Sequence, residues 1–332
     1  KKLLLILLCL PMIGFGQSSG TGFAINSKGY IATNFHVIDG AKNIQITGVD
    51  GKYQKSYKAT IVRVDKSNDL AILKIDVNLG NIPYGFKRNK EDVAASIYAY
   101  GYPLPEIQGY ELKITNGIIN SNSGFMDDPR WYQHTATIQS GNSGGPLFNQ
   151  YGNLVGINNA VINNETVREK YGTEATNVNY AIKSRYLYNL MEDLDISSFV
   201  NQGINKMSLS EQYNKIKDFV YFISCPLTTN EKNVYDFYLV LSENIMAMTT
   251  DYNQMLKEYK AYGAAYYMEE SKREGVSPEV IQQDKINEIN GFHERITHFK
   301  INADKSFRTK VNEFGMSYDD VMRKFGFEDF KQ

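Results

Sequence analysis

Ser143 is the residue whose surroundings point most directly to covalent chemistry. It lies in "GNSGG", residues 141–145, where glycines permit a sharp turn before a strand-turn-strand pattern, "PLFNQYGNLVGI". A serine hydroxyl is a weak nucleophile on its own. It needs a general base, a group that orients the base, and hydrogen-bond donors for the developing oxyanion. A catalytic Ser143 therefore requires partners elsewhere in the chain.

Four histidines are available as the base. His293 and His298 lie in a charged stretch with helical spacing, where a solvated helix face is expected. His134 belongs to an alternating run before the glycine-rich turn and is predicted to be a strand or surface residue. His36 follows the strand-like run "GYIATNF" and precedes a short apolar turn. Taken alone, a histidine in that position is more often a core or surface residue than a base.

Asp69 is the candidate for the orienting acid. It precedes the apolar run Leu70–Ile75 in "VDKSNDLAILKID", and an acid beside a buried strand needs a hydrogen-bonding or charged partner. In isolation it reads as an ordinary turn residue. The combination is more informative, because the order His36, Asp69, Ser143 is the order that chymotrypsin-type enzymes use.

The elements that must position these residues are predicted to be short strands. From Gly20 to about Lys183, runs rich in β-branched and aromatic residues alternate with Gly, Asn, Asp and Ser. This spacing is typical of an all-β barrel or sandwich, with enough strands for two small barrels connected near Asn78–Asp92.

After about Leu190 the apolar residues recur every three to four positions, which predicts helices. The stretches include "EQYNKIKDFVYFI" and two much longer ones. Ser277-Pro278-Glu279 has the composition of a helix start, and Gly275 and Gly315 lie where helices are expected to stop. We therefore predict a β domain over residues 17–195 and a helical accessory domain over residues 196–332.

Residues 1–16, "KKLLLILLCLPMIGFG", have the layout of a secretory signal peptide: a basic start, an apolar run and small residues. The run is too short for a stable membrane span of about 20 residues. We therefore expect an exported bacterial protein, periplasmic or secreted, without a membrane span in its mature form. Cleavage would remove Cys9 and leave Cys225 without an intramolecular disulfide partner, as a buried apolar filler.

Composition and residue spacing give no indication of a nucleic-acid, metal or cofactor partner. The net charge is −1 with no long run of one sign, so nothing indicates nucleic-acid binding. No spacing of His, Cys and acidic residues predicts a metal site, and no cofactor is expected.

Four segments in chain order resemble the HtrA/Deg-like trypsin-type serine proteases. The resemblance covers residues 20 to about 190, or roughly half of the chain, through the segments "SGTGFAINSKGYIATNFHVIDGA", "DKSNDLAILKI", "TIQSGNSGGPLFNQYGNLVGIN" and "NVNYAIKS". It implies a chymotrypsin-like double six-stranded β-barrel and a serine endopeptidase. His36 would then be the base, Asp69 its orienting acid and Ser143 the nucleophile.

The resemblance also implies an oxyanion hole and a specificity pocket. The backbone N–H groups of Gly141 and Ser143 would bind the oxyanion. The base of the pocket would lie near Thr137, and its walls would come from the segments that contain Ile157, Asn158, Asn159 and Tyr180. With no acid at Thr137 and no histidine in the walls, we expect a small or medium apolar side chain before the scissile bond.

Asn142 departs from the zymogen-activated members of this fold. Digestive trypsin-like enzymes carry an Asp there, which pairs with a newly cut N-terminus, and this chain has no activation sequence resembling "IVGG" near its start. We therefore expect no activation by N-terminal cleavage.

Residues 200–332 do not resemble the PDZ domain that usually follows in HtrA-like proteins, because they are helical and lack an obvious glycine-rich carboxylate-binding loop. A partner-binding or self-associating helical module is expected instead. Two functions remain open: a serine endopeptidase acting on proteins or peptides, and a catalytically weak or inactive protease fold that serves as a binding scaffold.

Overall fold

The computed structural model describes residues 18–159, 178–192, 194 and 208–330. The chain divides into two compact units: a β unit, Gln17–Pro226, and a helical unit that contains Leu227–Gln332. The division follows Pro226, whereas the sequence placed the boundary near residue 195. The predicted signal peptide, residues 1–16, lies outside the described residues.

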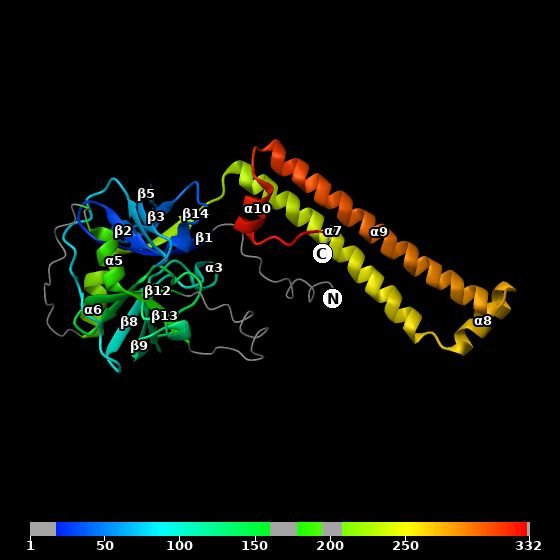
Figure 1. Cartoon of the computed structure of the whole chain (residues 1–332), viewed down its shortest axis with the longest axis horizontal. Helices are drawn as coiled ribbons and strands as arrows, with labels where there is room; N and C mark the ends of the chain where they lie inside the picture. Colours follow the sequence, from blue (N-terminus) through cyan, green and yellow to red (C-terminus); the bar gives the residue numbers. More distant parts are fainter. Residues whose placement is uncertain (1–17, 160–177, 193, 195–207, 331–332) are drawn as a thin grey trace. The chain divides into compact units, whose positions relative to one another are not determined.

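The first sheet of the β unit is an open half-barrel, since two of its strands have a neighbour on one side only among the described residues. Figure 1 labels five of its strands, β1, β2, β3, β5 and β14. Its strand order is β4 (Ser56–Lys58), β3 (Gln45–Thr47), β14 (Val220–Cys225), β1 (Ser18–Ala24), β2 (Tyr30–Thr33), β6 (Leu70–Lys74) and β5 (Thr60–Asp65).

The second sheet closes into a six-stranded barrel, because its first and sixth strands also pair with each other. The order around the barrel is β11 (Pro146–Asn149), β8 (Ser96–Gly101), β9 (Lys113–Ser121), β10 (Trp131–His134), β13 (Asn179–Lys183) and β12 (Asn153–Asn159). The short strand β7 (Gly85–Phe86) lies parallel to β12. The structure thus confirms the predicted fold class, with the first barrel half open.

β14 corrects the helical interpretation of "EQYNKIKDFVYFI". Only α6 (Leu209–Ile216) and a 3-10 turn (Lys217–Phe219) are helical there, and Val220–Cys225 form a strand between β1 and β3. Every residue of β14 is buried. A short, fully buried apolar run lacks the alternation that would distinguish a strand from a helix.

Large side chains from both sheets share one of the hydrophobic clusters of the β unit. Phe23 and Leu70 from the half-barrel pack in one cluster with Tyr100, Phe148 and Ile182 from the closed barrel. Burial raises the pKa of the Tyr100 hydroxyl far above its usual value. This shared core fixes the two sheets against each other, and with them the loops at their junction.

Short helices connect the strands of the β unit. Besides α6 these are α2 (Phe35–Ile38), α3 (Pro105–Gln108), α5 (Ser184–Met191) and the 3-10 turns Val49–Gly51 and Phe125–Asp127. α2 carries His36 and follows β2 directly, so the end of a central strand of the half-barrel fixes the position of that residue.

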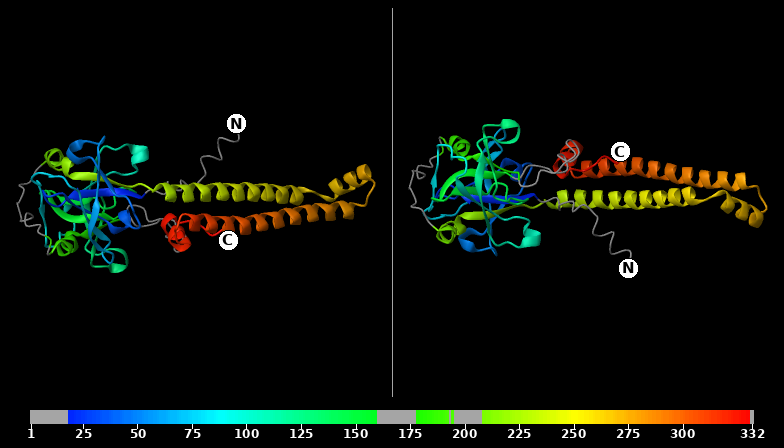
Figure 2. Two further views of the ribbon diagram at one scale, coloured as in Figure 1. Left: turned by 90° about the horizontal axis from the view of Figure 1, so that it is seen from above. Right: turned by 90° about the horizontal axis from the view of Figure 1, so that it is seen from below.

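The helical unit is an antiparallel hairpin of two long helices, α7 (Thr229–Ala261) and α9 (Pro278–Glu313), which run side by side (Figure 2). α8 (Ala264–Glu274) joins them, and α10 (Tyr318–Phe325) packs on α9. Ser277 directly precedes α9, which begins at Pro278, and Gly275 ends α8 with a left-handed backbone, as predicted. None of the described helices combines the length and apolarity needed to cross a bilayer.

Candidate active site

His36 and Asp69 are brought together by the pairing of β2 with β6. Thr33 pairs with Ala71, so the residues just beyond these strand ends become neighbours. The Nδ1 atom of His36 lies 2.6 Å from Oδ2 of Asp69, and the backbone N–H of His36 donates to Oδ1 at 2.8 Å. Because a carboxylate only accepts, Nδ1 carries the hydrogen and leaves Nε2 as the basic nitrogen in the neutral ring.

The backbone of Asp69 is held in an uncommon conformation. Its φ of 51° lies in the left-handed region, which Asp tolerates better than most residues. The Asp69 carbonyl accepts hydrogen bonds from the N–H of Phe35 at 3.2 Å and from Nδ2 of Asn34 at 2.9 Å. The segment before His36 therefore fixes both the carboxylate and the main chain of Asp69.

Ser143 lies in the tight turn before β11 and is 5 % exposed. Its carbonyl accepts from the N–H of Thr21 on β1 at 2.9 Å, and the N–H of Gly144 donates to the carbonyl of Asn158 on β12 at 2.9 Å. The turn that carries the candidate nucleophile is thus bound to a strand of each sheet.

The peptide groups before Gly141 and Ser143 have defined orientations. The Ser140 carbonyl accepts from Leu104 at 2.9 Å, and the Asn142 carbonyl accepts from Gly145 at 3.0 Å. In a trans peptide the N–H points opposite to the preceding carbonyl, so the N–H groups of Gly141 and Ser143 point away from these partners. A side chain at Gly141, whose φ is 95°, would place Cβ 2.2 Å from the Tyr102 carbonyl.

Thr21 is a positioning residue that the sequence reasoning missed. Its hydroxyl donates to the Gly141 carbonyl at 2.7 Å and accepts from the N–H of Tyr102 at 3.1 Å, and the side chain is fully buried. One threonine of β1 therefore contacts both ends of the Gly141–Ser143 turn. Nothing in the composition of "SSGTGF" separates it from an ordinary strand residue.

Asn158 and Asn159, predicted to line the pocket, make contacts in the site itself. Asn159 Nδ2 donates to Oδ2 of Asp69 at 2.8 Å, while the carbonyl of Asn158 holds Gly144. Two consecutive residues of β12 thus connect the candidate acid with the candidate nucleophile turn.

The other predicted pocket residues differ in how far they are exposed to solvent. Thr137 is exposed, and its carbonyl accepts from Oγ1 of Thr115 at 2.8 Å. Ile157 is fully buried, and Tyr180 is nearly buried, with its ring against Trp131 at 5.9 Å between centroids. Their role in side-chain selection stays a prediction.

The remaining histidines lie elsewhere. His134 is on β10 but is completely buried, which corrects the surface alternative. Burial lowers its pKa to about 4, against a smaller opposing effect of the backbone at Tyr180 and Ala136. His293 and His298 are exposed on α9, as predicted. Cys225 is buried, and no group of three or more side chains suited to a metal ion occurs among the described residues.

Comparison with known proteins agrees with this arrangement. Residues 20–157 match the trypsin-like peptidase domain. A probable periplasmic serine endoprotease DegP-like of Pseudomonas savastanoi is 36 % identical over 154 residues, covering 44 % of this chain and 29 % of that protein. Residues 20–157 of the β unit are thus similar to the trypsin-like peptidase domain of HtrA/DegP-type serine proteases.

Further relatives define how far the likeness extends. The uncharacterized protein y4bJ of Sinorhizobium fredii is 31 % identical over 215 residues, covering 65 % of this chain and 33 % of that protein. The chain thus spans about a third of the length of these curated relatives. The crystal structure of the serine endoprotease from Yersinia pestis is 32 % identical with a TM-score of 0.41, over 52 % of this chain and 56 % of that one.

Proposed function

We propose that this protein is an exported serine endopeptidase that hydrolyses peptide bonds of proteins or peptides. The observation that carries the proposal is the 2.6 Å contact between His36 and Asp69 in the same unit as the glycine-bounded turn of Ser143. The names of the DegP-like relatives agree with this activity.

In the proposed reaction, Oγ of Ser143 attacks the scissile carbonyl while Nε2 of His36 takes its proton. Asp69 holds the ring through Nδ1–H and stabilises the imidazolium that forms. The N–H groups of Gly141 and Ser143 donate to the oxyanion, a contribution worth about 3 kcal/mol per donor. His36 then protonates the leaving amine, and a water activated by the same nitrogen hydrolyses the acyl-enzyme.

The proposed enzyme needs no cut N-terminus. Asn142 stands where a zymogen-type enzyme has an Asp, and it is 6 % exposed. Thr21, in the interior of β1, already holds the Gly141 and Ser143 carbonyls. These contacts support a turn that is ordered by an internal strand residue rather than by a new terminal amine.

Two features of the substrate and setting belong to the same proposal. A small or medium apolar residue precedes the scissile bond, since Thr137 supplies no negative charge. The periplasmic names of relatives support export of the chain.

The helical hairpin of α7 and α9 serves as a binding or self-association module.

Labelling with a fluorophosphonate probe tests the proposal, with Ser143→Ala as the matched control. We expect covalent labelling of the wild-type protein at pH 7–8 and none of the variant, together with casein hydrolysis by the wild type alone. A folded wild-type sample that takes up no label between about pH 6 and 9, where a histidine base is available, would reject catalysis and leave the scaffold reading.

A further inference from the structure

The turn that carries Asp69 is stabilised by hydrogen bonds within it, one of them from the N–H of Asp69 to the Lys66 carbonyl at 3.4 Å. Residues 65–69 connect β5 to β6, and Asp65 accepts from the N–H of Asn68 at 3.0 Å and from its Nδ2 at 2.6 Å. Lys66 and Ser67, at the tip, are exposed. The left-handed backbone at Asp69 is sparsely populated in free peptides, so it persists only where its surroundings hold it.

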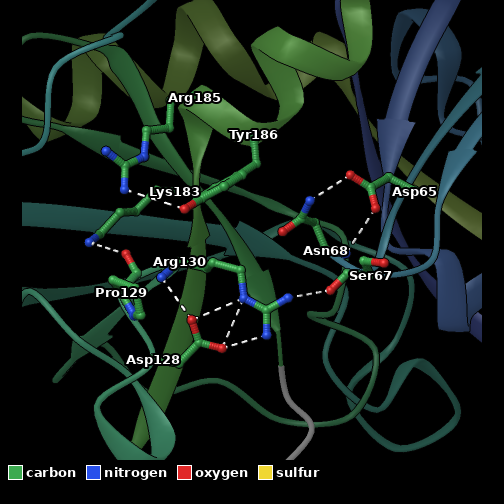
Figure 3. Close-up of polar contacts among 9 residues, drawn as sticks. All are labelled: Asp65, Ser67, Asn68, Asp128, Pro129, Arg130, Lys183, Arg185 and Tyr186. Carbon is green, nitrogen blue, oxygen red and sulfur yellow. Dashed lines mark hydrogen bonds and ion pairs between the residues drawn. The ribbon is translucent and has the colours of Figure 1, made fainter.

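Arg130 reaches this turn from the other sheet. It lies in the segment between β9 and β10, and its guanidinium stands between Asp128 and the Ser67 carbonyl, with one terminal nitrogen, Nη1, donating to that carbonyl (Figure 3). The other two nitrogens contact Asp128, with Nε donating to Oδ2 at 2.9 Å. Arginine suits this position because its planar fork can bind a carboxylate and still donate elsewhere.

Hydrogen bonds from Lys183 hold the backbone of the segment that contains Arg130. Lys183, nearly buried on β13, donates through Nζ to the carbonyls of Pro129 at 2.6 Å and Asn122 at 2.7 Å. Its backbone N–H donates to the Arg130 carbonyl at 3.0 Å. Hydrogen bonds from Arg130 keep the pKa of Asp128 below its usual value, so the partner of the guanidinium stays ionised at neutral pH.

We propose that Arg130 is a positioning residue for Asp69, which fixes the Ser67 carbonyl so that the turn delivers the carboxylate to His36. The inference rests on the proposed function for its kinetic consequence, but not for its structural one. Arg130 contacts neither His36 nor Ser143 in any described hydrogen bond, so it acts through the turn. Asp128 fixes the guanidinium and shares this role.

The test compares Arg130→Gln with Arg185→Gln in the full-length protein. Arg185 lies nearby on α5, and its described hydrogen bond goes to the Tyr186 hydroxyl at 3.4 Å, so this control removes the same charge without contacting the turn (Figure 3). We expect Arg130→Gln to lower kcat about tenfold, the loss corresponding to one charge-assisted hydrogen bond, with KM unchanged. Arg185→Gln should change kcat by less than about twofold.

A double-mutant cycle separates positioning from general loss of structure. If Arg130 acts through Asp69, then Arg130→Gln should slow fluorophosphonate labelling by less than about twofold in an Asp69→Asn background. Arg130→Lys should recover part of the wild-type rate, since an ammonium can reach the carbonyl but cannot also form the fork. An equal loss in both backgrounds, or a loss confined to KM, would overturn the proposal.

Amide hydrogen exchange provides a readout that does not need activity. The N–H groups of Asn68 and Asp69, which donate to Asp65 Oδ1 and to the Lys66 carbonyl, should exchange about tenfold faster in Arg130→Gln, and at the wild-type rate in Arg185→Gln. Unchanged exchange in Arg130→Gln refutes the positioning role. If the wild-type protein takes up no label, the proposed function fails, while exchange at the turn still decides whether Arg130 holds it.

Discussion

Thr21 offers a direct test of how the candidate nucleophile turn is held. Replacing it with valine keeps the shape of the side chain but removes the hydroxyl. That hydroxyl donates to the Gly141 carbonyl at 2.7 Å and accepts from the N–H of Tyr102 at 3.1 Å, in a fully buried position. Both backbone groups would lose these partners at once.

The expected loss follows from these two bonds. A buried polar group without a partner costs about 1–3 kcal/mol, so we expect the free energy of unfolding of Thr21→Val to fall by about 2–4 kcal/mol. The Gly141 carbonyl belongs to the Gly141–Asn142 peptide, which follows the peptide that carries the Gly141 N–H. If the turn shifts once the carbonyl loses its donor, the Gly141 N–H leaves the position proposed for an oxyanion donor. Loss of one such donor lowers kcat by about 100-fold, which sets the expected effect on peptide hydrolysis.

Thr21→Ser is the matched control, since it keeps the hydroxyl and removes one methyl group. We expect it to lose about 1 kcal/mol of stability and little kcat. Urea unfolding measures stability, and steady-state hydrolysis of a chromogenic peptide measures kcat and KM at a temperature where both variants are folded. A folded Thr21→Val protein with the kcat of Thr21→Ser would refute the reasoning.

Three further predictions concern other parts of the β unit. Asn159→Ala removes the 2.8 Å bond to Asp69 and should lower kcat about tenfold with KM unchanged, as steady-state kinetics would show. The folded pKa of His134 lies below its unfolded value, so its stability contribution is present above about pH 6.5. Chemical unfolding should show that the free energy of unfolding falls by about 3 kcal/mol as the pH is lowered toward 4. This decrease should be smaller in His134→Phe. Truncation after Pro226 should leave a folded β unit by circular dichroism, whereas truncation after residue 198 removes β14 and should unfold it.

The proximity of His36 and Asp69 could be predicted because catalytic side chains restrict residue type. A histidine after one strand and an acid before another are recognisable in a sequence, and the glycines at 141 and 144–145 mark a turn that other residues would obstruct. The contacts of Thr21 and Asn159 could not be predicted in the same way. They depend on which strand lies opposite which turn, and this is decided by the packing of two sheets.

β14 illustrates the same limit at the level of whole elements. "VYFISC" is mainly apolar, with Ser224 as its one plainly polar residue, so its sequence carries neither the period of a helix nor that of a half-buried strand. Its conformation is decided by pairing with β1 and β3, both of which are far from β14 in sequence. The helical interpretation was wrong here because tertiary pairing with β1 and β3, rather than local propensity, selects the conformation.

The position of β14 also bears on how the two units are connected. β14 pairs with β1 along six residues, and Phe222 lies opposite Thr21, whose hydroxyl holds the Gly141 carbonyl. Helix α7 begins at Thr229, four residues after the end of β14 at Cys225. The chain therefore leaves the β unit through the strand beside β1, which binds the nucleophile turn. A truncation that asks what the helices contribute must end after β14, since an earlier end removes part of the support of the site itself.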